Sequence, residues 1–225
     1  YTIIHNQALT SIKTLQAISK LSSGNHILIY TQYSPFSLGY KALERMADYL
    51  ESTGCAMVYA DHNDMQGETL TPHPVCDYQP GSVRDDFDFG SLLMFGYESF
   101  AQAACFLKDT SYAYSALYAL RLELSRHATI FHIRENLYTE VEEDARPSGE
   151  KQFDYVDPRN REVQREREAV FTAYLKQIGA FLQPASKQIC PTEGDFDCEA
   201  SVIIPVKNRV RTISNAIQSA LSQQT

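Results

Sequence analysis

The chain has 225 residues, of which 44% are hydrophobic and 21% charged, and its formal net charge is −8 at pH 7. These values are near the average of globular proteins and exclude a disordered or fibrous chain. The acidic balance excludes a general nucleic-acid binder, because such a protein needs a basic face to neutralise phosphates. We therefore expect one globular domain of ordinary size and part of another.

The five cysteines form no C-x-x-C pair. Cys190 and Cys198 flank a polar stretch and could form a disulfide, but reduced thiols in a cytoplasmic protein are the preferred interpretation. No apolar run reaches the length of a membrane span, and the N-terminus lacks the profile of a signal peptide. We expect a cytoplasmic protein.

The N-terminal part of the chain alternates between helical and strand patterns. Apolar residues recur every three positions over 7–21, which predicts a helix, and the apolar run 26–30 predicts a buried strand. The same two patterns return as a helix over 38–50 and a strand over 56–60. This alternation with short connections is typical of an α/β protein with a parallel sheet.

A long connection follows these elements. Residues 61–84 are polar and rich in proline and glycine, which predicts a loop at the strand ends, where α/β proteins usually carry function. Beyond it, the pattern predicts a strand over 91–95, a helix over 112–124 and strands over 129–133 and 137–141.

The C-terminal part contains the clearest helical pattern of the chain, over 161–182. Between 162 and 168 this pattern is dense in Glu and Arg, which is typical of a solvated helix face with i,i+4 pairs. The acidic stretch 183–199 contains two prolines and a glycine and suits a linker. A strand over 200–209 and a helix over 210–222 are predicted after it.

The last of these segments carries a resemblance. The stretch Ser201–Arg209 and its continuation through 217–223 resemble the opening of a family-2 glycosyltransferase, where a first strand ends in a Pro-Val-Tyr-Asn-like turn. The resemblance implies that Pro205, Val206 and Asn208 meet the nucleotide of the sugar donor, as expected at the end of a buried parallel strand. Lys207 replaces the usual Tyr.

The earlier part resembles the later half of the same GT-A fold, the nucleotide-diphospho-sugar transferase fold, in the order of the segments 27–46, 58–64, 90–95 and 118–141. The resemblance implies a mostly parallel sheet flanked by helices. It divides the chain into three parts: a partial or degenerate GT-A-like domain over 1–182, a linker over 183–199, and the first strand and helix of a truncated second domain over 200–225.

Departures from the family pattern bear on activity. The resemblance implies a divalent cation, Mg²⁺ or Mn²⁺, held on the sugar diphosphate by a carboxylate turn, and an Asp or Glu base for the acceptor hydroxyl. The metal turn corresponds to Thr31–Tyr33 and the base position falls near Ala116 and Leu117, and neither contains a carboxylate. We therefore expect a catalytically degenerate first domain and assign no catalytic residue.

Two clusters of polar residues could still form sites. Asp61 and Asp64, with His62 between them and His73 nearby in sequence, offer ligands for a cation at a strand end. The alternative interpretation is a solvated loop whose aspartates cap turns.

Asp85, Asp86 and Asp88 form the second cluster and alternate with aromatic residues, a combination that suits binding of an acceptor sugar. Rings can stack on the apolar face of a sugar while carboxylates accept its hydroxyl groups. Capping of a helix, or pairing with Arg84, explains these aspartates equally well.

The leading hypothesis is that the protein transfers a sugar from a nucleotide-sugar donor to a glycan or lipid-linked acceptor in polysaccharide biosynthesis. The resemblance also allows peripheral association with a membrane. The start at Tyr1 without a methionine, and the stop directly after an amphipathic helix, predict that the remainder of the second domain is missing. The alternative is a non-catalytic carbohydrate-binding or scaffolding domain.

Overall fold

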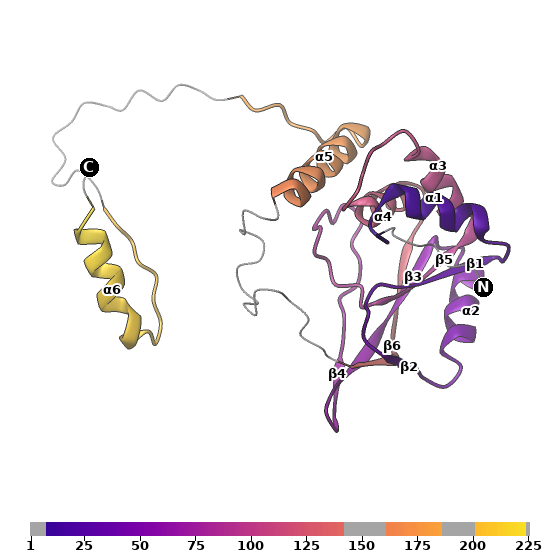
Figure 1. The fold of residues 1–225 in the computed structure, drawn as a ribbon, viewed down its shortest axis with the longest axis horizontal. Coiled ribbons are helices and arrows are strands. Elements are labelled where there is room, and N and C mark those ends of the chain that lie inside the picture. Colours follow the sequence, from indigo (N-terminus) through magenta and orange to yellow (C-terminus); the bar gives the residue numbers. More distant parts are fainter. Residues whose placement is uncertain (1–7, 142–160, 186–200, 224–225) are drawn as a thin grey trace. The chain divides into compact units, whose positions relative to one another are not determined.

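The computed structural model describes residues 8–141, 161–185 and 201–223 (Figure 1). Contacts within the chain divide it into two compact units, Tyr1–Leu182 and Gln183–Thr225, which we call unit 1 and unit 2. Cys55, Cys76 and Cys105 are free thiols, whereas Cys190 and Cys198 lie outside the described residues. Most of the predicted linker also lies outside them.

Unit 1 is built on one mixed sheet. Its strands follow the order β1-β5-β3-β6-β2. At one end of the sheet, β4 forms a hairpin with residues 62–66 of β3, beyond the part of β3 that pairs with β5 (Figure 1). The strands are β1 (His26–Tyr30), β2 (Phe36–Leu38), β3 (Met57–Gln66), β4 (Thr69–His73), β5 (Leu92–Gly96) and β6 (Ile130–Val141).

The combination of helices with one sheet confirms the general α/β class, whereas the strand directions correct the expected mostly parallel sheet. Only β3 and β6 pair in parallel, and the other pairs in the described sheet are antiparallel. Parallel neighbours require a crossover, usually a helix, between them. The chain instead leaves β3 through the β4 hairpin and returns to β5 without an intervening helix, so β5 runs antiparallel to β3.

Helices cover both faces of this sheet. Side chains of α1 (Ile12–Leu21), α3 (Tyr97–Phe106) and α4 (Ala116–His127) share one core with Met57 and Tyr59 of β3. Helix α2 (Ala42–Thr53) packs on the opposite face, against Val58 and Ala60. The alternation of these four β3 residues between the two cores is the period-two pattern of a strand buried on both faces.

Several stretches of unit 1 differ from the sequence prediction. Helix α3 was not predicted, because it follows β5 without a connecting turn and its apolar residues lack a clear helical period. The predicted loop 61–84 begins as the outer half of β3 and the β4 hairpin. The two strands predicted at 129–133 and 137–141 are one strand, β6, whose polar residues Arg134–Asn136 lie at a bulge opposite β3.

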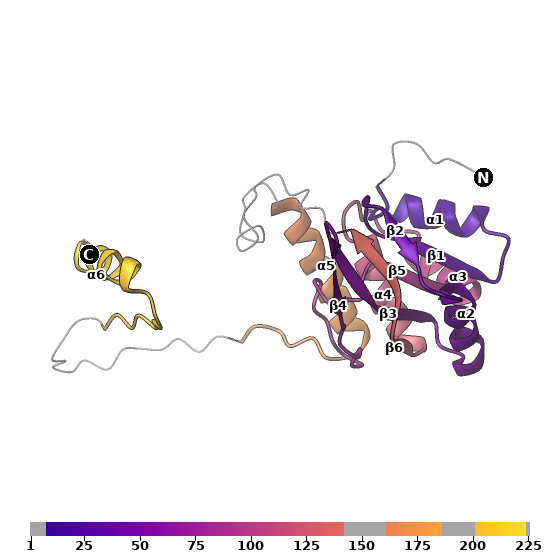
Figure 2. The same ribbon diagram turned by 90° about the horizontal axis from the view of Figure 1, so that it is seen from below.

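Helix α5 (Arg161–Gln177) lies alongside α4 in unit 1 (Figure 2). Its Glu-Arg run is not simply a solvated face, because the Glu166 carboxylate accepts hydrogen bonds from the backbone N–H groups of Ala113, Tyr114 and Ser115 at 2.9, 2.8 and 2.7 Å. These groups lead into the N-terminus of α4, where a negative charge is favourable. Glu166 therefore fixes α5 to the start of α4.

We expect the substitution Glu166→Gln to lower the free energy of unfolding by about 1–2 kcal/mol, because a neutral amide supplies one acceptor oxygen where the carboxylate supplies two. Denaturant unfolding followed by circular dichroism measures the change. Glu168→Gln is the matched control on an exposed position of the same helix, and it should leave stability within about 0.5 kcal/mol. Equal effects of the two substitutions would contradict the capping role.

Unit 2 contains helix α6 (Val210–Leu221), but the segment that precedes this helix does not form the predicted strand. Residues 201–206, predicted as part of a strand, form neither helix nor strand. A strand needs a neighbour for its backbone N–H and C=O groups, and the described residues of unit 2 contain no other strand. Among the described helices of the whole chain, none has the length and apolar character needed to cross a membrane.

Candidate functional site

The largest described cavity of unit 1, about 540 Å³, lies between the segment 85–90, the sheet and α4. Its volume is in the range of sites for small molecules. The wall combines acidic, aromatic and aliphatic side chains with one arginine. The lining residues are Thr31, Met57, Asp85, Asp86, Phe87, Asp88, Phe89, Gly90, Leu93, Phe95, Leu117, Tyr118 and Arg121.

The structure brings the three predicted acceptor-binding aspartates together on this cavity. Each also has a partner in the protein. Arg84 donates two hydrogen bonds of 2.9 Å to Asp86, and these bonds lower the pKa of Asp86 below its usual value. Arg167 of α5 donates to Asp85 at 2.7 Å. The pairing with Arg84 is therefore present alongside the position on the cavity, and the two interpretations are compatible.

Arg121 of α4 is the cationic residue of the cavity wall and was not singled out by the sequence. Its side chain is only 6% exposed and donates hydrogen bonds to the carbonyl oxygens of Ser82 and Arg84, at 2.7 and 2.5 Å. The guanidinium carbon lies 5.0 Å from the ring centre of Tyr118 and 5.6 Å from that of Phe89. These contacts hold the segment leading to the aspartates against α4.

Gly90 closes the aspartate segment in a conformation that only glycine adopts easily, with φ of +67°. A Cβ at this position would lie 2.3 Å from the Tyr138 hydroxyl oxygen and 3.3 Å from His62 Nδ1. The same hydroxyl accepts hydrogen bonds from the backbone N–H groups of Ser91 and Leu92 at 2.8 and 3.3 Å. The cavity wall is thus anchored to β6 through Tyr138.

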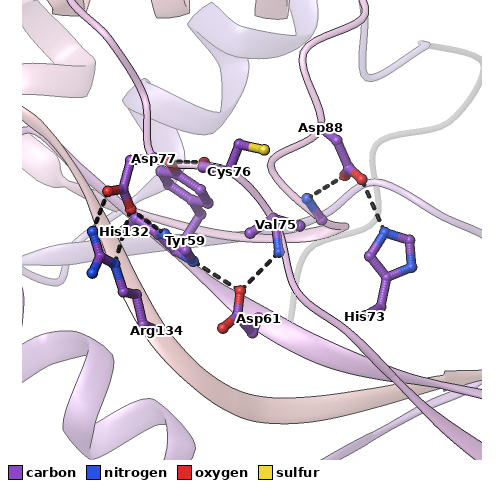
Figure 3. Close-up of polar contacts among 10 residues, drawn as sticks. Tyr59, Asp61, His73, Val75, Cys76, Asp77, Asp88, His132 and Arg134 are labelled. Atoms are coloured by element: carbon purple, nitrogen blue, oxygen red, sulfur yellow. Dashed lines mark hydrogen bonds and ion pairs between the residues drawn. The ribbon is translucent and has the colours of Figure 1, made fainter.

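A second network lies around Asp61 (Figure 3). Asp61 Oδ1 accepts a hydrogen bond from the Val75 backbone N–H at 2.8 Å and lies 2.9 Å from His132 Nε2. The other ring nitrogen of His132 lies 2.7 Å from Asp77 Oδ1, and Arg134 donates to the same carboxylate. Hydrogen bonds from Arg134 and His132 lower the pKa of Asp77 to about 2.

The His132 ring also stacks on Tyr59, with 4.9 Å between the ring centres, and the Tyr59 hydroxyl donates to the Cys76 carbonyl oxygen at 2.7 Å. Burial raises the pKa of Tyr59. The hydrogen bonds of Asp61, His132 and Tyr59 together hold the segment 75–77 against β3 and β6. No role was predicted for His132, because its partners lie 55 and 71 positions away in sequence.

The structure does not bring Asp61 and Asp64, the two predicted metal ligands, into one group. They lie three positions apart on β3 and their side chains leave opposite faces of the strand. Asp64 instead groups with His62 and with His73 of β4, so that one ligand atom from each lies within 4.8 Å of the others.

No family model matches this chain, and no curated protein matches it either.

The metal turn implied by the resemblance can be tested directly against the geometry. Thr31 lines the cavity, but its hydroxyl donates to the Ser91 carbonyl oxygen at 3.4 Å, and Gln32 and Tyr33 offer no carboxylate. Magnesium and manganese prefer several oxygen ligands, including carboxylates. The residues of this turn do not fit such a cation.

Proposed function

We propose that the chain is part of a nucleotide-sugar-dependent glycosyltransferase that acts on a glycan or lipid-linked acceptor in polysaccharide biosynthesis. In this proposal unit 1 is a GT-A-like module without catalytic residues of its own, and its cavity binds a sugar unit. The supporting observation is that Thr31, at the position of the family's donor turn, lines the same cavity as the carboxylates of the segment 85–88.

The side chains of the cavity suit a sugar ligand. Phe87, Phe89 and Tyr118 offer aromatic surface for the apolar face of a pyranose ring. Asp85, Asp86 and Asp88 offer acceptor oxygens for hydroxyl hydrogens, and hydrogen bonds to ionised acceptors are stronger than those between neutral groups.

Transfer itself needs groups that the described residues of unit 1 do not supply at the expected positions, because neither Thr31–Tyr33 nor Ala116 and Leu117 carries a carboxylate. We therefore assign the nucleotide to unit 2, at the turn containing Pro205, Val206 and Asn208. Unit 1 would hold and position an acceptor sugar for a reaction completed by a second domain.

Calorimetric titration of the chain tests this proposal. The ligands are a panel of UDP-hexoses and the matching free hexoses and oligosaccharides, each with and without Mn²⁺. We expect binding of sugars that is insensitive to Mn²⁺, because the turn that would hold the cation on the donor has no carboxylate. A lack of binding to every sugar tested would contradict the role given to the cavity.

We expect Asp86→Asn to weaken the binding of such a sugar by about tenfold, which corresponds to about 1.4 kcal/mol, because the carboxylate is a stronger acceptor than the amide. Stability should change little, since the Asp86 side chain is 64% exposed and its ion pair with Arg84 is at the surface. Asp109→Asn, at an exposed position away from the cavity, is the control and should leave affinity unchanged.

A non-catalytic carbohydrate-binding module is the second candidate function. The residues of the turn Thr31–Tyr33, which do not fit a donor cation, favour it. Binding of glycans without any binding of UDP-sugars, by a chain that also contains the remainder of the second domain, would select this alternative.

A further inference from the structure

The β3–β4 hairpin carries a group of side chains of the types that can bind a metal, outside the residues that line the cavity. His62 and Asp64 lie on one face of β3, two positions apart, and His73 of β4 is directly opposite His62 in the antiparallel register. The two imidazole rings stack with 4.3 Å between their centres. Asp64 lies between them, with one oxygen 2.7 Å from His73 Nδ1 and the other 3.4 Å from His62 Nε2.

His62 lacks the hydrogen bonds that its burial calls for. It is only 3% exposed, and its Nδ1 has no hydrogen-bond partner among the described residues. Its Nε2 has only the long contact with Asp64. Burial of a polar nitrogen without a partner is unfavourable, and such a group in a native protein calls for an explanation. A cation held at Nε2 would give this buried ring a strong interaction on the side of Asp64, and Nδ1 would remain without a hydrogen-bond partner among the described residues.

The surroundings of His73 resemble the support of a metal-bound histidine. Its Nε2 lies 3.0 Å from Asp88 Oδ2, which leaves Nδ1 directed at Asp64. Metal-ligating histidines usually donate their second ring nitrogen to a carboxylate in this way, and the bond fixes both the tautomer and the ring orientation.

We propose that His62, Asp64 and His73 bind a divalent transition metal, with zinc as the best match. Two imidazole nitrogens and one carboxylate oxygen form a common ligand set of zinc sites that keep one position open. Imidazole ligands suit zinc, copper, iron and nickel, whereas magnesium, calcium and manganese prefer oxygen ligands. The site therefore differs in metal and in residues from the cation implied by the resemblance.

Only small movements are needed to form this site. Ligand atoms around a tetrahedral zinc lie roughly 3.4 Å apart, given metal–ligand bonds of about 2.0–2.2 Å. The three candidate atoms already lie within 4.8 Å of one another, on two hydrogen-bonded strands. Asp88, which supports His73, also lines the sugar cavity, so the metal site borders that cavity.

Zinc titration of the metal-free chain, prepared by chelation and followed by calorimetry, tests the proposal. We expect one zinc ion per chain, an increase in Tm on zinc addition, and no comparable response to Mg²⁺. Substitution of Co²⁺ should give the visible absorption of a four-coordinate site. No sugar is present in this experiment, so its outcome is independent of the outcome for the proposed sugar site.

Single substitutions test which residues bind the metal. His73→Ala removes one ligand and should weaken zinc affinity by more than the roughly 10–100-fold typical of losing a supporting residue. His127→Ala is the matched control, because His127 is an exposed histidine paired with Glu123 on α4. Asp64→Asn provides a second ligand variant should His73→Ala fail to fold. The proposal is overturned if the wild type binds no zinc, or if the ligand variants bind it as tightly as the control.

Discussion

Replacing Gly90 by alanine is expected to lower the free energy of unfolding of unit 1 by about 3–5 kcal/mol, the largest effect that we expect from a single methyl group. Two costs combine. A φ of +67° is unfavourable by about 1–2 kcal/mol for a residue with a Cβ. The added Cβ would also lie 2.3 Å from the Tyr138 hydroxyl, a buried group that cannot move without losing its hydrogen bonds to Ser91 and Leu92.

Gly67→Ala separates these two costs. Gly67 has a φ of +60° in the β3–β4 turn, and a Cβ there would meet nothing within 4 Å. We expect Gly67→Ala to lower the free energy of unfolding only by the conformational cost, about 1–2 kcal/mol, when both variants are compared by denaturant unfolding. The double variant Gly90→Ala/Tyr138→Phe should be less destabilised than the sum of its single changes, because removing the hydroxyl relieves the contact. Additive costs would contradict this explanation.

Removing the carboxylate of Asp61 is expected to lower the free energy of unfolding by about 2–4 kcal/mol. Asp61→Ala leaves the Val75 backbone N–H and His132 Nε2 without their acceptor in a buried part of the sheet. The segment 75–77 would lose one of its attachments to β3. Thermal or denaturant unfolding measures the loss, and faster hydrogen exchange of the Val75 amide should accompany it.

Two further variants test whether the hydrogen bonds of Asp61 carry this cost. Asp61→Asn keeps an acceptor for the Val75 N–H and should destabilise less than Asp61→Ala. Asp48→Ala, at an exposed position of α2, should change stability by no more than about 0.5 kcal/mol. If Asp61→Ala were as mild as Asp48→Ala, the network in Figure 3 would have no structural importance.

The local elements of this fold could be predicted from the sequence where one pattern dominates. The run HILIY at 26–30 is apolar without interruption and forms β1, and the segments around α2 and α6 have clear helical spacing. The aspartates of 85–88 were also singled out, because carboxylates that alternate with aromatic residues suit sugar binding, and they line the largest described cavity.

What the sequence could not predict depends on partners far apart in the chain. The strand directions were wrong because alternation of elements suggests crossovers, whereas the stretch between β3 and β5 contains a hairpin and no helix. Glu166 and Arg121 are charged residues within helical patterns, and only the packing of α4 against α5 and of α4 against 82–84 reveals their roles. His62 and His73 meet because the β3–β4 hairpin pairs them.

Hydrogen exchange of the chain with and without a saturating sugar tests the central claim most directly, because it locates the binding site. The probe is the free hexose or oligosaccharide, without a nucleotide, that gives the strongest calorimetric response. We expect slower backbone exchange in the segment 85–90 and in α4 near Tyr118 and Arg121, which line the cavity. Protection confined to 201–209, or elsewhere than these segments, would contradict a sugar site in unit 1.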